Sequence, residues 1–469
     1  MRRLIPFLII LLFSGCATMA PERELPPMPV PATWPDESTA RADIPGWRDT
    51  FPDTALQALI ESALHENRNL RQAVLNLDKA RAQLGVAHAD RWPDVSTSGS
   101  STTNRYPADL SSSGQSGINR QWAVNLGATS FELDFFGRVK SLEDKALEEY
   151  LATEEARRAV HIGLVSQIAR TYLALAADRE GLTLARDTLL SRQETLRLTQ
   201  ARIANGLGTD LERLQAEEAV AVAESEVARL KAQVSMDQNA LAVLTGRAVP
   251  DLHLPAQTIS AVKIVEDIKP GLPSELLTRR PDILEAEHRL WAAGAQIGAA
   301  RAAFFPRISL TSTVGLASLE LTDLFDATQR TWTFIPSFTL PIFDMGRNKA
   351  NLAAAEAEQD IRLAAYEYAI QNAFREVADN LARNEGYRGQ VEAQAKRVSS
   401  AGQSRILVEQ RYDAGLESLF AVHDAERTLF SARQTLLAAR LSQKLNTVDL
   451  FAALGGGWEE TTPLAAARP

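Results

Sequence analysis

Cys16 is the residue with the clearest chemical potential, because it is the only cysteine in a chain of 469 residues. Without a second cysteine the chain cannot form an internal disulfide, and a free thiol in an oxidising compartment would be a liability. Arg2 and Arg3, followed by the apolar run from Leu4 to Phe13, have the charged and hydrophobic regions of a secretory signal peptide. The run is too short for a comfortable membrane span. The N-terminus therefore predicts export, with Cys16 available for covalent modification.

The segment FSGC, residues 13–16, resembles a bacterial lipobox, in which the cysteine becomes the lipid-bearing first residue of the mature protein. Phe13 differs from the aliphatic residue usual at that place. Ala17 follows the cysteine in place of an aspartate, which by the same resemblance favours sorting to the outer membrane. We therefore predict a signal peptide over residues 1–15 and a lipid on Cys16. The alternative is a lone buried cysteine beside an uncleaved helix.

No group of side chains predicts an enzyme or a metal site. The six histidines are scattered, no His-Glu-x-x-His pattern or cysteine pair exists, and the segment GQSG lacks the flanks of a nucleophile elbow. The net charge of −9 and the pI near 5.4 give no sign of the basic face that nucleic-acid-binding proteins carry. The sequence therefore predicts no catalysis, no cofactor apart from a covalent lipid on Cys16, and no nucleic-acid partner.

The chain contains two copies of one plan. RIANGLGTDLERLQAEEA, which begins at Arg202, aligns without a gap with RYDAGLESLFAVHDAERT, which begins at Arg411, at an offset of 209. AQLGVAHADRWP and AQIGAARAAFFP place Pro93 opposite Pro306, at an offset of 213. The change from 213 to 209 means that a few residues are inserted or deleted between these stretches, and loops tolerate such changes. The predicted organisation is a lipid-anchored, proline-rich segment at 16–53, a first repeat at 54–246, an equatorial linker at 247–271, a second repeat at 272–455 and a tail at 456–469.

Each repeat is predicted to contain a short helix, two strands, a long helix, a tight turn and a second short helix. A composition rich in Ala, Leu, Glu, Gln and Arg indicates the helices, and apolar residues in alternating steps of three and four indicate coiled-coil seams. A helix of about 64 residues would be about 95 Å long, and the two short helices of a repeat, stacked end to end, would match it. The predicted helices are 54–90, 140–203 and 210–245 in the first repeat, and 273–304, 346–412 and 418–453 in the second.

Between the short and long helices of each repeat the apolar period changes to two. In RISLTSTVGL, Ile308, Leu310 and Val314 alternate with polar residues, and in WTFIPSFTL, Trp332 and Phe334 share one parity. Such segments are typical of transmembrane β-strands, although hairpins packed on a soluble core have the same period. Four strands cannot close a membrane barrel, because the smallest has about eight and an open edge in lipid leaves backbone groups unsatisfied. We therefore predict a symmetric oligomer whose chains share one barrel.

Taken together, these features resemble the TolC-like outer membrane efflux proteins, and specifically their lipoprotein (NodT/OprM-like) branch. The stretches that carry the resemblance are ELDFFGR and PIFDMGR at the two strand-to-helix hinges, GLPSELLTRRPDI from residue 271, FFPRISL from residue 304 and RYDAGLESLFAVHDAER from residue 411. The resemblance covers nearly the whole mature chain, and the hinge stretches together with LPSELLTRRPDI make it specific.

The resemblance implies an α+β membrane protein that forms a homotrimer. Three chains would share a 12-stranded β-barrel in the bacterial outer membrane, and their long antiparallel coiled-coil helices would form an α-helical barrel extending into the periplasm. It implies a passive exit duct for small molecules that works with a periplasmic adaptor (membrane fusion protein) and an inner-membrane pump of the resistance-nodulation-division type. The alternatives are a lipid-anchored periplasmic coiled-coil adaptor without a pore and the exit duct of a type I protein secretion system.

Four hinge residues follow from the same resemblance. Gly137 and Gly346 would permit the sharp backbone turn from strand to helix. Arg138 and Arg347 lie where a guanidinium could bond freed carbonyls or the lipid-proximal edge. The alternative is that these arginines are solvated helix starts.

A periplasmic gate is implied at the second tight turn. Phe420 and Asp424 are four residues apart and so lie on one helical face, and the matching family positions line the periplasmic constriction. A threefold repeat would then form a hydrophobic ring and a carboxylate ring. Arg427 and Tyr412 match family positions that bond neighbouring helices in the closed state, with Glu212 as the expected partner from the first repeat. An ordinary solvated coiled-coil tip is the alternative.

Overall fold

The structure is a computed structural model that describes residues 18–25, 45–110, 114–249, 254–255, 258–265, 268 and 273–458. Cys16, the predicted signal peptide and most of the tail after residue 455 lie outside the described residues. The chain forms two compact units. The first unit takes residues 1–27, 76–154 and 285–367, and the second takes residues 28–75, 155–284 and 368–469. Each unit draws on both sequence repeats, so the compact units do not follow the repeat boundaries.

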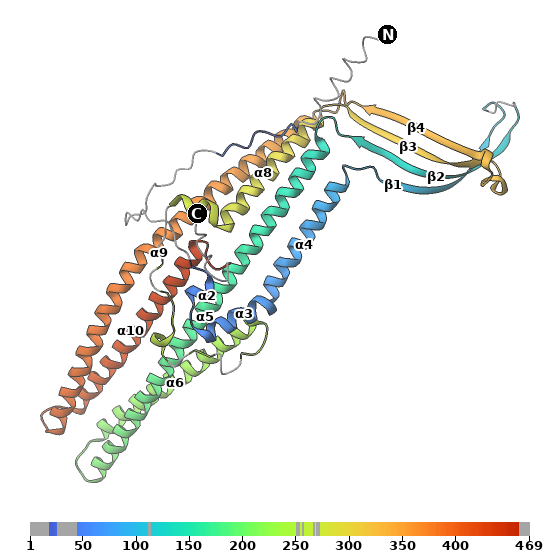
Figure 1. The fold of residues 1–469 in the computed structure, drawn as a ribbon. Coiled ribbons are helices and arrows are strands. Elements are labelled where there is room, and N and C mark those ends of the chain that lie inside the picture. The colour runs from blue at the N-terminus through green and yellow to red at the C-terminus, as the bar shows by residue number, and fades with distance from the viewer. Residues whose placement is uncertain are drawn as a thin grey trace, which may run out of the picture. The chain divides into compact units, whose positions relative to one another are not determined.

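A four-stranded antiparallel sheet dominates the first unit (Figure 1). Its strands are β1 (Val95–Tyr106), β2 (Gly117–Leu133), β3 (Arg307–Ser318) and β4 (Arg330–Thr339). They are paired in the order β1-β2-β3-β4, so β2 and β3 join the two repeats in the middle of the sheet. β1 and β4 each have one strand neighbour within the described part of the chain. The prediction of four strands is confirmed, and β1 forms although most of its residues are polar.

The strand register explains the period of two. Leu126 on β2 lies opposite Val314 on β3, and Val314 lies opposite Trp332 on β4, so one face carries an apolar row across three strands. All three side chains are exposed. An exposed apolar row on a sheet is typical of a surface that faces lipid or another protein. The ladder between β2 and β3 has one irregularity, where β2 contains one extra residue near Ser130, whose φ is 57°.

Long helices follow each pair of strands. α5 (Arg138–Ala204) and α6 (Asp210–Thr245) belong to the first repeat, and α9 (Arg347–Asp413) and α10 (Leu419–Ala453) to the second. These bounds nearly coincide with those of the predicted helices. By length and composition α5 could cross a membrane, but 61% of its most apolar window is buried inside the fold. That window is therefore accounted for by packing.

The first short helix of each repeat differs from prediction, because it is divided. In place of one helix over 54–90 the chain has α3 (Thr54–Glu66) and α4 (Arg68–Ala89), after a short α2 (Trp47–Thr50). In place of one helix over 273–304 it has η3 (Pro273–Glu275), α7 (Leu276–Arg279) and α8 (Pro281–Ala302). The remaining short 3₁₀ turns are η2 (Ile259–Ala261), η4 (Leu321–Asp323) and η5 (Ala327–Gln329).

Two equivalent residues make these breaks. Asn67 has an extended backbone, with φ −65° and ψ 129°, and its side-chain carbonyl accepts the N–H of Leu70 to start α4. Arg280 is also extended, with φ −78° and ψ 119°, as expected for a residue that precedes proline. Composition and apolar spacing do not reveal such breaks, because both segments keep a helical pattern on either side.

The two breaks bond the ends of the last helices in the same way. The Asn67 amide donates to the Leu244 carbonyl at 2.8 Å, and the Arg280 guanidinium donates to the Ala453 carbonyl at 2.8 Å. Leu244 corresponds to Ala453 at the same offset of 209 that relates the two repeats. Gly246 follows in the left-handed region with φ 71°, and its counterpart after Ala453, Gly455, has φ 79°. The repeats therefore share a structural joint and not only a sequence pattern.

The core of the second unit lies beside these joints. Its largest fully buried side chains include Trp47, Phe51, Tyr172 and Phe451. Phe51 and Phe451 meet edge to face, with ring centroids 5.5 Å apart. The hydroxyl of Tyr172 donates to Asp53, the carboxylate that also caps α3. Helices from both ends of the chain are thereby packed together.

In the first unit, residues 18–25 lie against α5 and α8. Arg23 donates to the buried Glu148 carboxylate at 2.6 Å, and His288 bonds the other oxygen of Glu148 at 2.8 Å. The hydroxyls of Thr18 and Ser141 are 3.0 Å apart. The segment that follows the predicted lipid attachment residue is therefore fixed to the first turns of α5.

Candidate functional site

The tips of the two helical hairpins in the second unit are built alike. After α5, Gly206 has φ 76° and the Leu207 N–H donates to the Arg202 carbonyl. After α9, Gly415 has φ 74° and the Leu416 N–H donates to the carbonyl of Arg411. This is the Schellman pattern, which ends a helix at a glycine in the left-handed conformation. It turns the chain back within a few residues, so the side chains that begin α6 and α10 lie at the hairpin tips.

The new helices begin with hydroxyl caps. The Thr209 side chain accepts the Glu212 N–H, and the Glu212 carboxylate accepts the Thr209 N–H at 2.7 Å, which completes a capping box. Ser418 caps α10 through the N–H of Ala421. Glu212 therefore stabilises the start of its own helix. Within the described part of the single chain it does not bond Arg427 or Tyr412, and its predicted role as their partner stays a prediction for contacts between chains.

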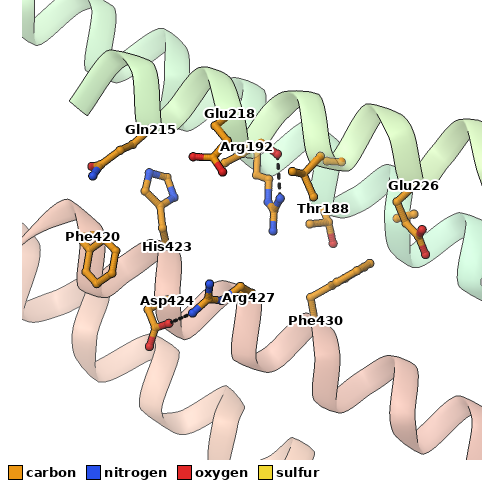
Figure 2. Close-up of a pocket in the computed structure, with 14 residues that line it drawn as sticks. Thr188, Arg192, Gln215, Glu218, Glu226, Phe420, His423, Asp424, Arg427 and Phe430 are labelled. Atoms are coloured by element: carbon orange, nitrogen blue, oxygen red, sulfur yellow. Dashed lines mark hydrogen bonds and ion pairs between the residues drawn. The ribbon is translucent and has the colours of Figure 1, made fainter. Parts of the chain in front are cut away.

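A cavity of about 370 Å³ lies between α5, α6 and α10 behind the second tip, as Figure 2 shows. Phe420 and Asp424 both line it, as their spacing of four predicts. Arg427, one turn further along α10, forms an ion pair with Asp424. The ring of Phe430 and the side chains of Ala219 and Val222 supply apolar wall. The structure therefore brings Phe420, Asp424 and Arg427 together at one cavity.

Equivalent positions of both repeats face this cavity. Gln215 and Glu218 on α6 correspond to Asp424 and Arg427 on α10 at the offset of 209, and all four line the cavity. The second repeat contributes an acid and a base where the first contributes an amide and an acid. The charge pattern of the tip is therefore not duplicated, although the backbone is.

Buried polar groups lie directly behind the cavity. Arg192 on α5 is buried, lines the cavity and donates to the carbonyl of Ala219 at 2.8 Å (Figure 2). Burial lowers the pKa of Arg192, and the nearby Glu426 carboxylate acts in the opposite direction. His423 lines the cavity too, and neither of its ring nitrogens has a hydrogen-bond partner among the described residues. Its Nδ1 lies 3.9 Å from Glu426.

Sequence reasoning did not assign a role to this buried group. In the sequence, Arg192 is a polar residue in the apolar seam of α5, which includes Leu182 and Ala185, and these two pack against Leu230 of α6. A long polar residue at a seam position is the one signal that could have identified it. Arg202 was also missed as a functional residue, although it hydrogen bonds to the Tyr412 hydroxyl and lies 5.3 Å from the centre of its ring.

The hinge residues of the first unit are placed by backbone and charge. Gly137 has φ 70° and Gly346 has φ 83°, values that favour glycine. Arg138 bonds both oxygens of Glu132 at 2.7 Å, and Arg307 bonds the same carboxylate at 2.6 Å. The partner of Arg138 is thus a carboxylate at the end of β2, in place of the freed carbonyls or lipid edge that we expected.

The second hinge has no matching charge cluster among the described residues. Arg347 is exposed at the start of α9, and the turn before it is held by Asp344, which accepts the N–H groups of Gly346 and Asn348. Ile342, Phe343 and Met345 in this turn are exposed. The two hinges therefore share a backbone turn but differ in the side chains that secure it.

Comparison with known proteins decides the family. The family model described as outer membrane efflux protein matches residues 59–247 and 272–456, two segments that overlap the predicted repeats. The chain is 44% identical to a probable efflux pump outer membrane protein, TtgC of Pseudomonas putida, over 96% of this chain and 94% of that protein. It is 42% identical to outer membrane protein OprJ of Pseudomonas aeruginosa, over 98% and 97%. The chain belongs to the outer membrane efflux protein family.

The efflux protein fold also matches solved channels. The open-state crystal structure of the Neisseria gonorrhoeae MtrE outer membrane channel aligns with a TM-score of 0.87 at 38% identity, covering 96% of this chain and all of that one. The fold prediction of long coiled-coil helices and four strands per chain is thereby confirmed. So is the prediction of an outer membrane channel component of a tripartite efflux system. The family is one of channel and transport proteins, located in the bacterial outer membrane.

Over the ranges that the structure describes, no group of three or more His, Cys, Asp or Glu side chains is placed to hold a metal ion. The gate roles of Phe420, Asp424, Arg427 and Tyr412 remain predictions, because the position of a side chain does not by itself establish that it gates a channel. The lipid on Cys16 remains a prediction outside the described residues.

Proposed function

We propose that the efflux protein is a homotrimer whose twelve strands form one transmembrane barrel. The observation that carries this proposal is the open four-stranded sheet in a chain of an outer membrane family. Each open edge would leave backbone N–H and C=O groups unsatisfied in lipid, and a single sheet of four strands cannot close. Cyclic association pairs every edge with that of a neighbour. Three chains give twelve strands, within the range of closed membrane barrels.

The trimer acts as a passive exit duct and performs no covalent chemistry. Three copies of Phe420 and Asp424 around the axis form the hydrophobic and carboxylate rings of a periplasmic gate. The cavity behind them supports this role, because it leaves α10 room to shift without breaking a packed interior. The bond between Arg202 and Tyr412 joins α5 to α9 and holds the two hairpins in one arrangement.

The duct works with an adaptor and a pump. We infer a periplasmic adaptor of the membrane fusion class and an inner-membrane pump of the resistance-nodulation-division type, with small molecules as cargo. The stretch LPSELLTRRPDI supports this assignment over protein secretion. A lipid on Cys16 anchors the chain in outer-membrane lipid, and the contacts of residues 18–25 with α5 and α8 support a fixed N-terminal anchor.

The test uses the full chain expressed in a Gram-negative host. Outer membranes should yield an oligomer that runs as a trimer without heating and as a monomer after boiling, and the purified oligomer should conduct ions in planar bilayers. Cells lacking their own efflux channels should regain resistance to small toxic molecules only when adaptor and pump are also present. A monomeric, non-conducting periplasmic protein would refute the proposal and favour the pore-free adaptor. Export of a polypeptide in place of small molecules would favour secretion.

A further inference from the structure

The sheet contains one complete junction between a first repeat and a second repeat. β2 ends the first pair of strands and β3 begins the second, and they pair with Leu133 opposite Ile308. Just beyond this pair the ring of Phe136 in the first hinge stacks on Phe305, with centroids 4.9 Å apart and an interplanar angle of 23°. The first hinge therefore contacts the segment that leads into β3, although Phe305 is still 42% exposed.

The reverse junction, from a second repeat to a first repeat, is absent from the described chain. It would join the outer edge of β4 to the outer edge of β1. Val95 corresponds to Ile308 and Trp92 to Phe305 at the offset of 213, and Ile342 corresponds to Leu133 at the offset of 209 that relates the hinge glycines. These residues are where a matching contact would form.

The pairing of the strands gives the same correspondence between Leu133 and Ile342 without use of the hinge glycines. Val95 pairs with Ala128 in the first repeat, and Ile308 pairs with Phe338 in the second, so Ala128 and Phe338 are equivalent at an offset of 210. The one extra residue of β2 near Ser130 reduces the offset to 209 from there to the hinge. Ladder and hinge thus agree on the position of Ile342.

The end of β2 shows what the reverse junction would do. The ladder with β1 stops at Ala128, so the last pairs of β2, from Phe131 to Leu133, are made with β3 alone. The equivalent segment, residues 340–342, lies beyond the end of β4 at Thr339. Residues 340–342 have no strand partner within the described chain, and an exposed edge of this kind is a template for pairing with another chain, whose β1 would be the partner.

The apolar side chains at both sides of the reverse junction are exposed. Val95 and Trp92 are 62% and 68% exposed, and the second hinge exposes a patch of three apolar side chains by 83% to 91%, namely Ile342, Phe343 and Met345. At the complete junction, by contrast, Phe136 is partly covered by its stacked partner. Large exposed apolar side chains next to an open strand edge mark an interaction surface.

We propose that the second hinge of one subunit seats on the start of β1 in the next subunit. Residues 340–342 extend β4 along that strand with Ile342 opposite Val95, and the exposed patch at residues 342, 343 and 345 covers Trp92. The occupant is a second copy of this chain because the first hinge already makes the equivalent contact within the chain. The inference rests on the trimer proposed above and assigns the register and the hinge contact of its interface.

Cysteine cross-linking in outer membranes tests the register. Directly opposite residues of antiparallel strands have Cβ atoms about 4.5–5.5 Å apart, and a disulfide needs about 3.5–4.5 Å, so a mild oxidant should join Val95→Cys to Ile342→Cys between subunits. The matched control is Ser96→Cys with Ile342→Cys, because a shift of one residue turns the side chain to the other face. All variants keep the native Cys16. Variants with only one of the added cysteines therefore show any cross-linking that involves Cys16.

We expect boiled, non-reduced samples to show covalent dimers and trimers for the Val95 pair and at least about tenfold less for the Ser96 pair, since the two differ by one step of the pleat. Equal cross-linking of both pairs, or none in either, would overturn the register. Unheated samples report the trimer separately. Conducting trimers without the cross-link would refute this inference and leave the duct intact, whereas the loss of every oligomer would refute both.

A serine pair tests the hinge contact against membrane lipid as the alternative occupant. Trp92→Ser with Phe343→Ser should abolish most of the unheated trimer band while the chain still fractionates with the outer membrane. Val314→Ser, an exposed apolar residue on the central strand β3, is the control and should keep its trimers. If the Val314 variant loses as much trimer as the hinge variant, the hinge side chains serve as general lipid contacts and the proposal is wrong.

Discussion

Arg280→Met should destabilise the second repeat far more than the loss of an ordinary surface arginine. The Arg280 side chain is 8% exposed and makes two bonds to Asp282, one to Glu376 and one to the buried carbonyl of Ala453. Burial alone would lower the pKa of Arg280, but its bonds to the two carboxylates outweigh burial and raise it. The guanidinium is therefore charged in the fold, and it is the only side-chain donor to that carbonyl among the described residues.

The expected loss of stability depends on whether water can replace the bond that Arg280 makes to each partner. Asp282 and Glu376 are 41% and 36% exposed, so water can replace much of what they lose. The Ala453 carbonyl is buried and would stay unsatisfied, at a cost of about 1–3 kcal/mol. Breaking a fully buried pair costs about 3–5 kcal/mol, so a partly buried one with this carbonyl should cost about 2–4 kcal/mol.

The assay is the apparent melting temperature of the helical circular dichroism signal, measured on detergent-purified protein at one scan rate. Arg375→Met is the control, because Arg375 is an exposed arginine that pairs with Asp379 along the same face of α9 and should contribute at most about 0.5 kcal/mol. Arg280→Lys should recover only part of the loss, since an ammonium cannot hold two carboxylates and a carbonyl in one plane. Equal melting of the Arg280→Met and Arg375→Met variants would refute the reasoning.

Three further predictions follow from other parts of the second unit. Burial raises the pKa of Asp178 to about 7, and the neighbouring Asp237 carboxylate acts in the same direction. The folded chain thus holds this proton more tightly than the unfolded chain, whose pKa is about 3.9, so stability falls as the pH rises between these values, and Asp178→Asn should flatten the loss in melting temperature from about pH 4 to about pH 7. An unchanged pH profile would argue against a raised pKa of Asp178 in the folded chain. Phe420→Ala combined with Asp424→Ala should raise single-channel conductance in planar bilayers, and unchanged conductance would remove both residues from the gate. Gly246→Ala should cost about 1–3 kcal/mol, because its φ is 71° and a Cβ would lie 2.7 Å from the Glu66 carbonyl oxygen. A melting temperature equal to that of the parent would show that this joint can relax.

The element order could be predicted because the two repeats align, so that an element that is clear in one repeat identifies its counterpart in the other. Residues 95–104 are too polar to identify as a strand alone, yet they occupy the place of Ile308 and its followers in the second repeat. The apolar pattern of β1 does not define its register on β2, which is known only from the paired residues in the structure. The breaks at Asn67 and Arg280 could not be predicted, because the bonds that define them reach carbonyls that are distant in the sequence.

The site could be predicted in part. The spacing of Phe420 and Asp424 places them on one face, and the structure has both at one cavity. The partners of Arg138 and Tyr412 could not be deduced, because each is decided by which side chain the fold brings within reach. For Arg138 that is Glu132 at the end of the preceding strand, and for Tyr412 it is Arg202, on a different helix.

The differences between the repeats carry as much information as their likeness. A trimer of identical repeats would have sixfold walls, and every feature of the tip would occur six times. In this chain the backbone of the tip is duplicated. Both turns have a glycine with positive φ, and the residue after each glycine donates its N–H to the carbonyl of the equivalent arginine, Arg202 or Arg411. The charges are not duplicated, because Gln215 and Glu218 stand where the second repeat has Asp424 and Arg427. In a trimer, any constriction made by that ion pair would therefore have threefold symmetry, although the backbone that carries it is repeated six times.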